Sequence, residues 1–181
     1  VLILEATTLN TGHNWRFEAL YMGEPPRQGT ADQSLREDVD KNTILERTKW
    51  SDLPEACRDF PLGSAVASSA CFPGGFPPML VPGLFDDLVV ELVDGGVHDN
   101  QGVCGLFDLD AHRMIISDAS GQMADMPEPS TRIPAAAGRA SSIYGDRVRE
   151  EQLIESTARP DTVLVHLRKG LPARGVSPFG V

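Results

Sequence analysis

The sequence is poor in cysteine, in basic side chains and in long apolar runs, and each shortage excludes a class of protein. Three cysteines without a CxxC spacing predict neither a disulfide framework nor a zinc or redox site. Sixteen Lys and Arg against 26 Asp and Glu give a net charge of −10, which argues against nucleic acid as a partner. No apolar run reaches the roughly 18 residues of a membrane-spanning helix, and no signal-peptide pattern opens the chain.

The residues that are present fit a globular chain. The 181 residues are 41 % hydrophobic and 23 % charged, a balance that differs from that of disordered sequences. Gly and Pro are abundant, with 17 and 14 copies scattered along the chain without a period. Length and composition together predict one α/β domain rich in loops.

The order of apolar and polar segments predicts strands interleaved with helices. Strands are expected over 1–7, 87–93, 113–117 and 162–167, helices over 42–50, 61–71 and 139–156, a hairpin around 15–21 and an exposed loop over 23–40. Because such alternation is typical of parallel sheets, we expect a mainly parallel sheet with helices on both faces. Ligands of such sheets bind beyond the carboxyl ends of the strands.

Two of the expected strands end in an aspartate, Asp94 and Asp118. Asp94 is followed by Gly95 and Gly96, which allow a sharp turn and a close approach of the backbone, so that the carboxylate can face a cleft. Many Asp-Gly-Gly sequences form turns and nothing more. The motif by itself therefore leaves a structural turn and a functional carboxylate both open.

Three longer blocks of sequence give the motif a context. They are residues 4–12 (LEATTLNTG), 61–74 (PLGSAVASSACFPG) and 93–102 (VDGGVHDNQG), and residues 116–120 (ISDAS) follow them. In this order and at these separations the blocks resemble the patatin-like phospholipase family. The resemblance implies a three-layer α/β fold that hydrolyses lipid esters with a Ser–Asp dyad and needs no metal or other cofactor. It also implies a peripheral contact with membranes, and it leaves the location open between the cytoplasm and a membrane surface.

By the same resemblance, Asp94 is the aspartate of the dyad, and Gly95 and Gly96 complete its motif. An Asp beside a Ser hydroxyl in a partly dry cleft is a better base, because burial disfavours its charged form. The serine would attack the ester carbonyl and form an acyl-enzyme, which water then hydrolyses.

The GxSxG nucleophile motif and the glycine-rich oxyanion loop of that family are absent from the 181 residues. In the family both lie N-terminal to the first block, and this chain begins at Val1. We therefore expect residues 1–181 to be the C-terminal part of a patatin-like hydrolase domain, with a sheet incomplete on its N-terminal side and no activity by itself. The alternative is a catalytically silent fragment, or a pseudoenzyme that acts as a binding module.

Three other functional hypotheses compete with plain structural explanations. His98 is a candidate general base, and the alternative is a histidine with an ordinary place in a loop. Cys104 is a candidate thiol nucleophile together with His98 or His112, and the alternative is a cysteine that only packs. A divalent-cation site competes with solvated acidic turns, because the carboxylates do not follow the spacing of an EF-hand loop. The carboxylates concerned are Asp86, Asp87, Glu91, Asp94, Asp99, Asp108 and Asp110.

The remaining features carry no assigned chemistry. For the loop 72–79, contact with an acyl chain and plain packing are both possible roles. His13 is expected in a turn and His166 in a strand, both without a role. The charged face of the last helix is expected to lie in solvent. It carries Arg139, Arg147, Arg149, Glu150 and Glu151.

Overall fold

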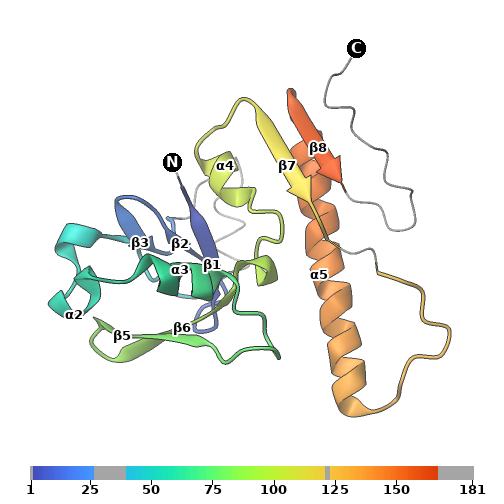
Figure 1. Ribbon diagram of the computed structural model, residues 1–181, viewed down its shortest axis with the longest axis horizontal. Coiled ribbons are helices and arrows are strands. Elements are labelled where there is room, and N and C mark those ends of the chain that lie inside the picture. The colour runs from blue at the N-terminus through green and yellow to red at the C-terminus, as the bar shows by residue number, and fades with distance from the viewer. Residues whose placement is uncertain (1, 27–39, 121–122, 167–181) are drawn as a thin grey trace.

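The computed structural model describes residues 2–26, 40–120 and 123–166, and Figure 1 shows them as two bodies with a short helix between. The larger body is a six-stranded sheet with helices α2 (Glu55–Arg58) and α3 (Leu62–Ser69). The smaller body is the long helix α5 (Ile133–Thr157) with strands β7 (Met114–Asp118) and β8 (Thr162–His166), and α4 (Cys104–Asp108) lies between the two. Among the described residues, no helix is both long and apolar enough to cross a bilayer.

The six-stranded sheet is antiparallel throughout, in the order β4-β3-β2-β1-β6-β5. The prediction of a mainly parallel sheet is therefore wrong. The physical reason lies in the connections: β5 and β6 are joined by Asp86 and Asp87 alone, and so short a link can only reverse the chain. The strands are β1 (Leu4–Thr8), β2 (Asn14–Phe17), β3 (Tyr21–Gly23), β4 (Thr48–Lys49), β5 (Met79–Phe85) and β6 (Leu88–Asp94).

Strands β7 and β8 do pair in parallel, with α5 as the connection between them. This is the arrangement that alternating strands and helices predict, because a parallel pair needs a long crossover. The expected α/β class is thus confirmed, with the parallel part confined to a two-stranded sheet.

Most of the expected elements are present, and one is not. The strands expected over 87–93 and 113–117 are β6 and β7, and α3 falls within the expected 61–71. The prediction of a helix over 42–50 is wrong. Residues 42–45 form no regular element, Glu46 makes an isolated bridge with Glu24, and the segment ends in β4 and the first residue of the short 3-10 helix η1 (Trp50–Asp52). Its backbone pairs with Glu24: the Leu45 N–H donates to the Glu24 carboxylate at 2.8 Å, and the Glu24 N–H donates to the Leu45 carbonyl at 2.9 Å.

Of the segment 23–40, the structure describes residues 23–26 and 40, and residues 27–39 lie outside the described part. Gly23 and Glu24 are buried. The Glu24 carboxylate accepts hydrogen bonds from the hydroxyls of Thr8 and Thr11, which hold it against the β1–β2 turn.

The core has two parts, one in each body. The sheet buries Ala6, Trp15 and Phe17 together with Leu53 and Ala65 from the helical side. A smaller cluster joins Val103, Met114 and Ile116 to Leu106, Leu153 and Leu164 at the meeting point of α4, β7, α5 and β8. Because side chains alternate along a strand, Ala6 faces the sheet core while its neighbour Glu5 points to the opposite face, toward α4.

Candidate active site

Asp94 is the last residue of β6, and three hydrogen bonds fix its position. Its backbone N–H donates to the Cys71 carbonyl at 2.9 Å, and its carbonyl accepts from the Thr7 hydroxyl at 3.0 Å. Its carboxylate oxygen Oδ1 accepts from the Gly96 N–H at 2.7 Å and thereby caps the 3-10 helix η2 (Gly95–Val97). Among the described residues, none donates a hydrogen bond to Oδ2 of Asp94. One carboxylate oxygen is thus held in place while the other is available.

Gly95 and Gly96 are required because neighbouring atoms leave too little room for a side chain, and not because of their backbone conformation. Neither has a positive φ. A Cβ at Gly95 would lie 2.4 Å from the carbonyl oxygen of Glu5, a backbone atom that cannot move aside. A Cβ at Gly96 would lie 3.0 Å from Oδ1 of Asp94 and 3.0 Å from Oδ1 of Asn100. The two glycines therefore let the turn after Asp94 lie directly on β1 and beside Asn100.

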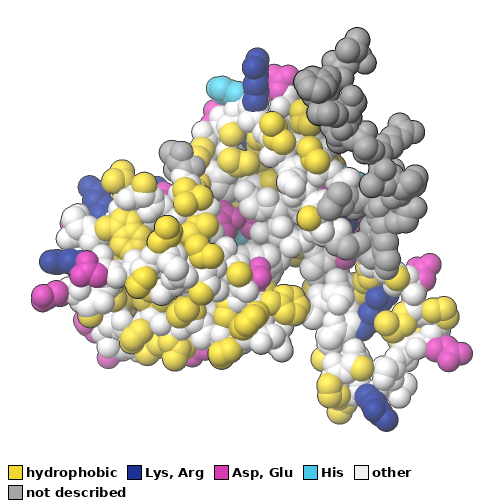
Figure 2. All heavy atoms as spheres, viewed as in Figure 1, with side chains coloured by type: hydrophobic (Ala, Val, Ile, Leu, Met, Phe, Trp, Pro, Cys, Tyr) yellow, Lys and Arg dark blue, Asp and Glu magenta, His cyan; other side chains and the backbone are white. Residues whose placement is uncertain are grey.

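The Asp94 turn borders a pocket of about 500 Å³. Figure 2 shows a recess between the two bodies, with acidic side chains in its floor and hydrophobic side chains around it. An apolar pocket with a few converging polar groups is the usual form of a small-molecule site. Its walls are Leu2, Ile3, Leu4, Glu5, Ser69, Asp94, Gly95, Gly96, Asp99, Asn100, Gly102, Gly105, Leu106 and Leu109.

A buried charge cluster lies at the floor of this pocket. Arg16 donates from Nε to Oε1 of Glu5 at 3.1 Å and from a terminal nitrogen to Asp108 at 2.5 Å. Asp99 is buried and accepts from the backbone N–H groups of Val103 at 3.1 Å and Cys104 at 2.7 Å, at the start of α4. The cluster therefore joins β1 and β2 of the sheet to α4.

Glu5 and Asp99 titrate in opposite directions within the cluster. Burial, followed by the nearby charge of Asp99, raises the pKa of Glu5 to about 8. The pKa of Asp99 is lowered, because its hydrogen bonds with Glu5 and with the N–H groups of α4 outweigh its burial. Glu5 thus holds a proton near neutral pH while Asp99 stays ionised. No motif in the sequence points to Glu5 or Arg16. The signal that could have found them is a charged residue in a mainly apolar segment, opposite a charge of the other sign on the neighbouring strand.

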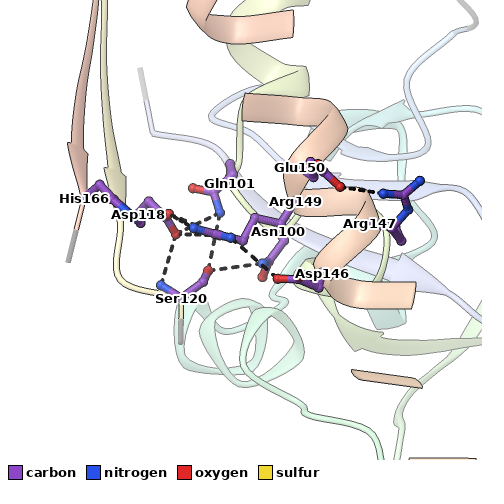
Figure 3. Close-up of polar contacts among 9 residues, drawn as sticks. All are labelled: Asn100, Gln101, Asp118, Ser120, Asp146, Arg147, Arg149, Glu150 and His166. Carbon is purple, nitrogen blue, oxygen red and sulfur yellow. Dashed lines mark hydrogen bonds and ion pairs between the residues drawn. The ribbon is translucent and has the colours of Figure 1, made fainter. Parts of the chain in front are cut away.

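A second polar cluster, drawn in Figure 3, anchors α5 beside the pocket. Asp118 ends β7 and is fully buried, and Arg149 of α5 contacts it through Nε and a terminal nitrogen, the shortest contact being 2.5 Å. His166 at the end of β8 contacts the same carboxylate through Nδ1 at 2.8 Å. Hydrogen bonds, above all that from Arg149, hold the pKa of Asp118 well below its usual range.

This cluster reaches the Asp94 turn through two side chains. Gln101 donates to Asp118 at 3.3 Å, and Asn100 donates to the Ser120 hydroxyl at 3.2 Å. The expectation that Arg149 lies in solvent is wrong, since its side chain is 12 % exposed, whereas Arg147 at 68 % lies in solvent as expected. Regular spacing of charges on a helix does not reveal which of them meets a strand end from elsewhere in the chain.

The thiol and histidine candidates find no support in the geometry. Burial and the carboxylates of Asp99 and Glu5 raise the pKa of Cys104 far above its usual value, which keeps the thiol protonated and poorly nucleophilic. Burial lowers the pKa of His98, and its Nδ1 is buried without a hydrogen-bond partner among the described residues. His13 instead bridges two carboxylates, with Nδ1 at 3.0 Å from Glu24 and Nε2 at 2.7 Å from Asp40.

The acidic residues considered as a cation site do not come together. In the described part of the chain, no group of three or more His, Cys, Asp and Glu side chains is arranged to hold a metal ion. Asp86 and Asp87 are exposed in the β5–β6 turn, whereas Asp99 is bonded to backbone N–H groups and Asp108 to Arg16.

The chain matches a known protein family. Residues 7–104 match the family model described as patatin-like phospholipase, which is more than half of the chain. The matched range begins within β1 and ends at the first residue of α4, so it contains Asp94, Gly95 and Gly96. No curated protein matches the chain.

Proposed function

Since the chain belongs to the patatin-like phospholipase family, we propose that it takes part in the hydrolysis of lipid esters and that Asp94 is the aspartate of a Ser–Asp dyad. The observation that carries this proposal is the place of Asp94: it ends the inner strand β6, lies inside the matched range and opens onto the largely apolar pocket. A lipid hydrolase needs a fixed base, room for a substrate and apolar walls. The strand end fixes Asp94, and the pocket offers the room and the apolar walls.

In the proposed reaction, Asp94 accepts a proton and gives it up again in each of two steps, acylation and deacylation. The free carboxylate oxygen accepts the proton of the serine hydroxyl as the serine oxygen bonds to the ester carbonyl carbon. When the carbon–oxygen bond to the leaving alcohol breaks, Asp94 returns that proton to the leaving oxygen. Water then attacks the acyl carbonyl carbon while Asp94 accepts one proton from it. When the bond from that carbon to the serine oxygen breaks, Asp94 gives this proton to the serine oxygen, and the fatty acid leaves.

The contacts of Asp94 suit it to this role. The bond from the Gly96 N–H holds Oδ1 and sets the plane of the carboxylate, so that Oδ2 keeps one direction. Backbone bonds to Cys71 and from Thr7 fix the residue itself. A base held in this way loses little orientational freedom when the reaction begins, which is a main source of catalytic rate.

The serine of the dyad is assigned to a polypeptide segment outside the 181 residues, because no GxSxG occurs among them. Ser69 lines the pocket with Asp94, but it lies at the last position of α3 between Ser68 and Ala70, without the flanking glycines of a nucleophile turn. Ser69 is therefore a control position in the experiments that follow.

The test of the dyad is the substitution Asp94→Asn in the product of the whole coding sequence. Asn keeps the hydrogen bond with the Gly96 N–H but cannot accept the serine proton, so kcat for a phospholipid or p-nitrophenyl ester should fall about 10²- to 10⁴-fold. Asp86→Asn, at the far end of β6, is the matched control and should leave kcat unchanged. Turnover by Asp94→Asn at the rate of the unsubstituted enzyme would overturn the assignment.

An experiment on the 181-residue chain distinguishes two further possibilities. The chain is either a silent fragment or binding module, or a complete enzyme whose nucleophile lies among its own residues. Incubated with a fluorophosphonate probe and a p-nitrophenyl acyl ester, this chain should show neither labelling nor turnover. Labelling that Ser69→Ala abolishes would place the nucleophile on α3 and contradict our assignment. If the whole coding sequence also shows neither labelling nor turnover, the binding module is the correct description.

A further inference from the structure

A second pocket lies on the larger body, beside the first turns of α3. It has a volume of about 400 Å³ and forms where the start of β1 and the end of β2 meet η1, α2 and α3. Its walls are mainly apolar and include three aromatic side chains, Phe17, Trp50 and Phe60. We refer to it as the aromatic pocket. A pocket of this size with apolar walls and few polar groups is the usual form of a ligand site.

The aromatic walls are fixed by contacts that they make themselves. The rings of Phe17 and Phe60 stack with their centroids 5.3 Å apart. The indole N–H of Trp50 donates to the carbonyl of Glu18 at 2.8 Å, so the polar atom of this side chain is satisfied by the backbone. Because the rings are already held in place, a ligand that packs on them loses little affinity to ordering the pocket.

A guanidinium lies at the edge of the aromatic pocket. Arg58 of α2 lines the pocket, and its Nε donates to the Leu53 carbonyl at 2.8 Å. In the described part of the chain, nothing accepts a hydrogen bond from its two terminal nitrogens. Glu18 also lines the pocket, but Arg47 pairs with its carboxylate at 3.4 Å. The charge that stays open at this edge is therefore positive.

An apolar pocket with an open guanidinium at its edge fits a ligand that has an apolar chain and an anionic group. A guanidinium binds a carboxylate through two parallel N–H···O bonds, and these charge-assisted bonds are among the strong ones in proteins. A fatty acid carries both parts in one molecule, and it is what the proposed reaction releases.

The aromatic pocket adjoins the pocket at Asp94. Leu2 and Leu4 line both pockets. Helix α3 borders both as well, with Ala65 at the aromatic pocket and Ser69 at the Asp94 pocket. A fatty acid released beside Asp94 therefore has a second place to bind within a short distance.

We propose that the aromatic pocket binds the released fatty acid, with the carboxylate on the terminal nitrogens of Arg58 and the chain on the aromatic walls. The proposal rests on the proposed function, which makes a fatty acid the product. The carboxylate exists only after the ester bond has been cleaved, so Arg58 distinguishes the free acid from the acyl group of the substrate.

The experiment measures binding of decanoate to the 181-residue chain by isothermal titration calorimetry, below the concentration at which decanoate forms micelles. Decanoate should bind about five- to tenfold more tightly than decanol, which has the same chain without the charge, and acetate should not bind. Arg58→Gln should remove the difference between decanoate and decanol. The matched control Arg113→Gln changes an exposed arginine of the smaller body and should leave both affinities as they are.

A second variant, Leu62→Asp, places a carboxylate at the edge of the same pocket. Leu62 lines the pocket and is 65 % exposed, and Asp is favourable in the first turn of a helix, so the variant should fold, as circular dichroism would verify. The added charge repels the ligand carboxylate, so Leu62→Asp should weaken decanoate binding more than decanol binding. Decanoate should also change the fluorescence of the chain, and Trp50→Phe should remove that change, because Trp15 is fully buried.

The outcomes separate this proposal from the proposed function. Asp94→Asn should bind decanoate as the unsubstituted chain does, because Asp94 lines the other pocket. No binding of decanoate, equal affinities for decanoate and decanol, or unchanged affinities in Arg58→Gln would overturn the fatty-acid site and leave the dyad unaffected. Undiminished turnover by Asp94→Asn, together with decanoate binding that depends on Arg58, would overturn the dyad and support the site.

A second copy of the chain is the other occupant that the measurements identify. A dimer in sedimentation velocity that Leu62→Asp dissociates, in a chain that does not bind decanoate, would assign the aromatic pocket to that copy. This result would overturn the fatty-acid site as well.

Discussion

At the scale of single residues, Gly95 shows how tightly the Asp94 turn lies on the sheet. A methyl group there would meet the Glu5 carbonyl oxygen at 2.4 Å, so Gly95→Ala must push η2 away from β1. We expect a loss of about 1–3 kcal/mol in the free energy of unfolding, as for other forced overpacking of a buried contact. Urea denaturation followed by circular dichroism measures this loss.

The control for Gly95 is Gly63 in α3. A Cβ at Gly63 meets no atom within 4 Å outside its own helix, and Ala is the better helix former. Gly63→Ala should therefore stabilise the chain by about 0.5–1 kcal/mol. Destabilisation by both variants to the same extent would show that the contact with Glu5 is not the cause.

Glu5 makes the stability of the fold depend on pH. Its pKa is raised to about 8 in the folded chain, against 4.5 in the unfolded chain, so between these values the folded state binds a proton that the unfolded state releases. The free energy of unfolding should then fall as pH rises from about 5 to 8, by at most about 1.4 kcal/mol per pH unit. Asp118 and Asp99, whose pKa values are lowered, remain ionised in this window.

Glu5→Gln tests this dependence, because an amide resembles the protonated acid. Chemical denaturation at several pH values between 5 and 8 should give a flatter profile for Glu5→Gln than for the unsubstituted chain. Glu55→Gln, at an exposed position of α2, should leave the slope as it is. A slope that survives in Glu5→Gln would assign the pH dependence to another group.

At the scale of secondary-structure elements, Arg149 ties α5 to the ends of β7 and β8. Arg149→Ala leaves the buried Asp118 with His166, Gln101 and the Ser120 N–H as partners, and removing one side of a buried ion pair is costly. We expect a loss of about 2–4 kcal/mol and faster hydrogen exchange in β8. Arg147→Ala is the matched control on the same helix.

Arg147 makes an ion pair of similar length, at 2.7 Å with Glu150, but both side chains are exposed. Exposed pairs contribute little, so Arg147→Ala should cost less than about 1 kcal/mol and leave exchange in β8 unchanged. Equal losses for the two variants would mean that Asp118 does not hold α5 in place.

The elements also show which pairings can be predicted from the sequence. β7, α5 and β8 follow each other in the chain, so their pattern predicts the parallel pair that the structure has. The antiparallel pairing of β1 with β6 joins residues 84 to 88 positions apart, such as Thr8 with Leu92 and Ala6 with Asp94, and leaves no local signal. The turn at Asp86 and Asp87 carries only a weak signal, because Asp is common in turns but Asp-Asp is not one of the typical two-residue hairpin sequences.

At the scale of the whole molecule, the two bodies meet through polar groups beside the pocket. Gln152 of α5 donates to the His98 carbonyl at 3.3 Å and accepts from the Gln101 N–H at 3.3 Å. The assignment of Asp94, Gly95 and Gly96 to the site stays a prediction; the sequence could suggest it because these residues form a continuous motif within the blocks that resemble the family. Glu5, Arg16, Asp99 and Gln152 belong to different segments, so their assembly around the pocket follows only from the fold.

The central position of β1 also has a consequence for the order of folding. β1 and β2 are close in sequence, as are β5 and β6, so each hairpin can form quickly and alone. The β1–β6 pair must first close a long loop, and such closure slows folding. Because the pocket needs β1, η2 and α4 together, it comes into existence only at that late step. A chain arrested before it would retain both hairpins and much of its secondary structure, yet would have no site.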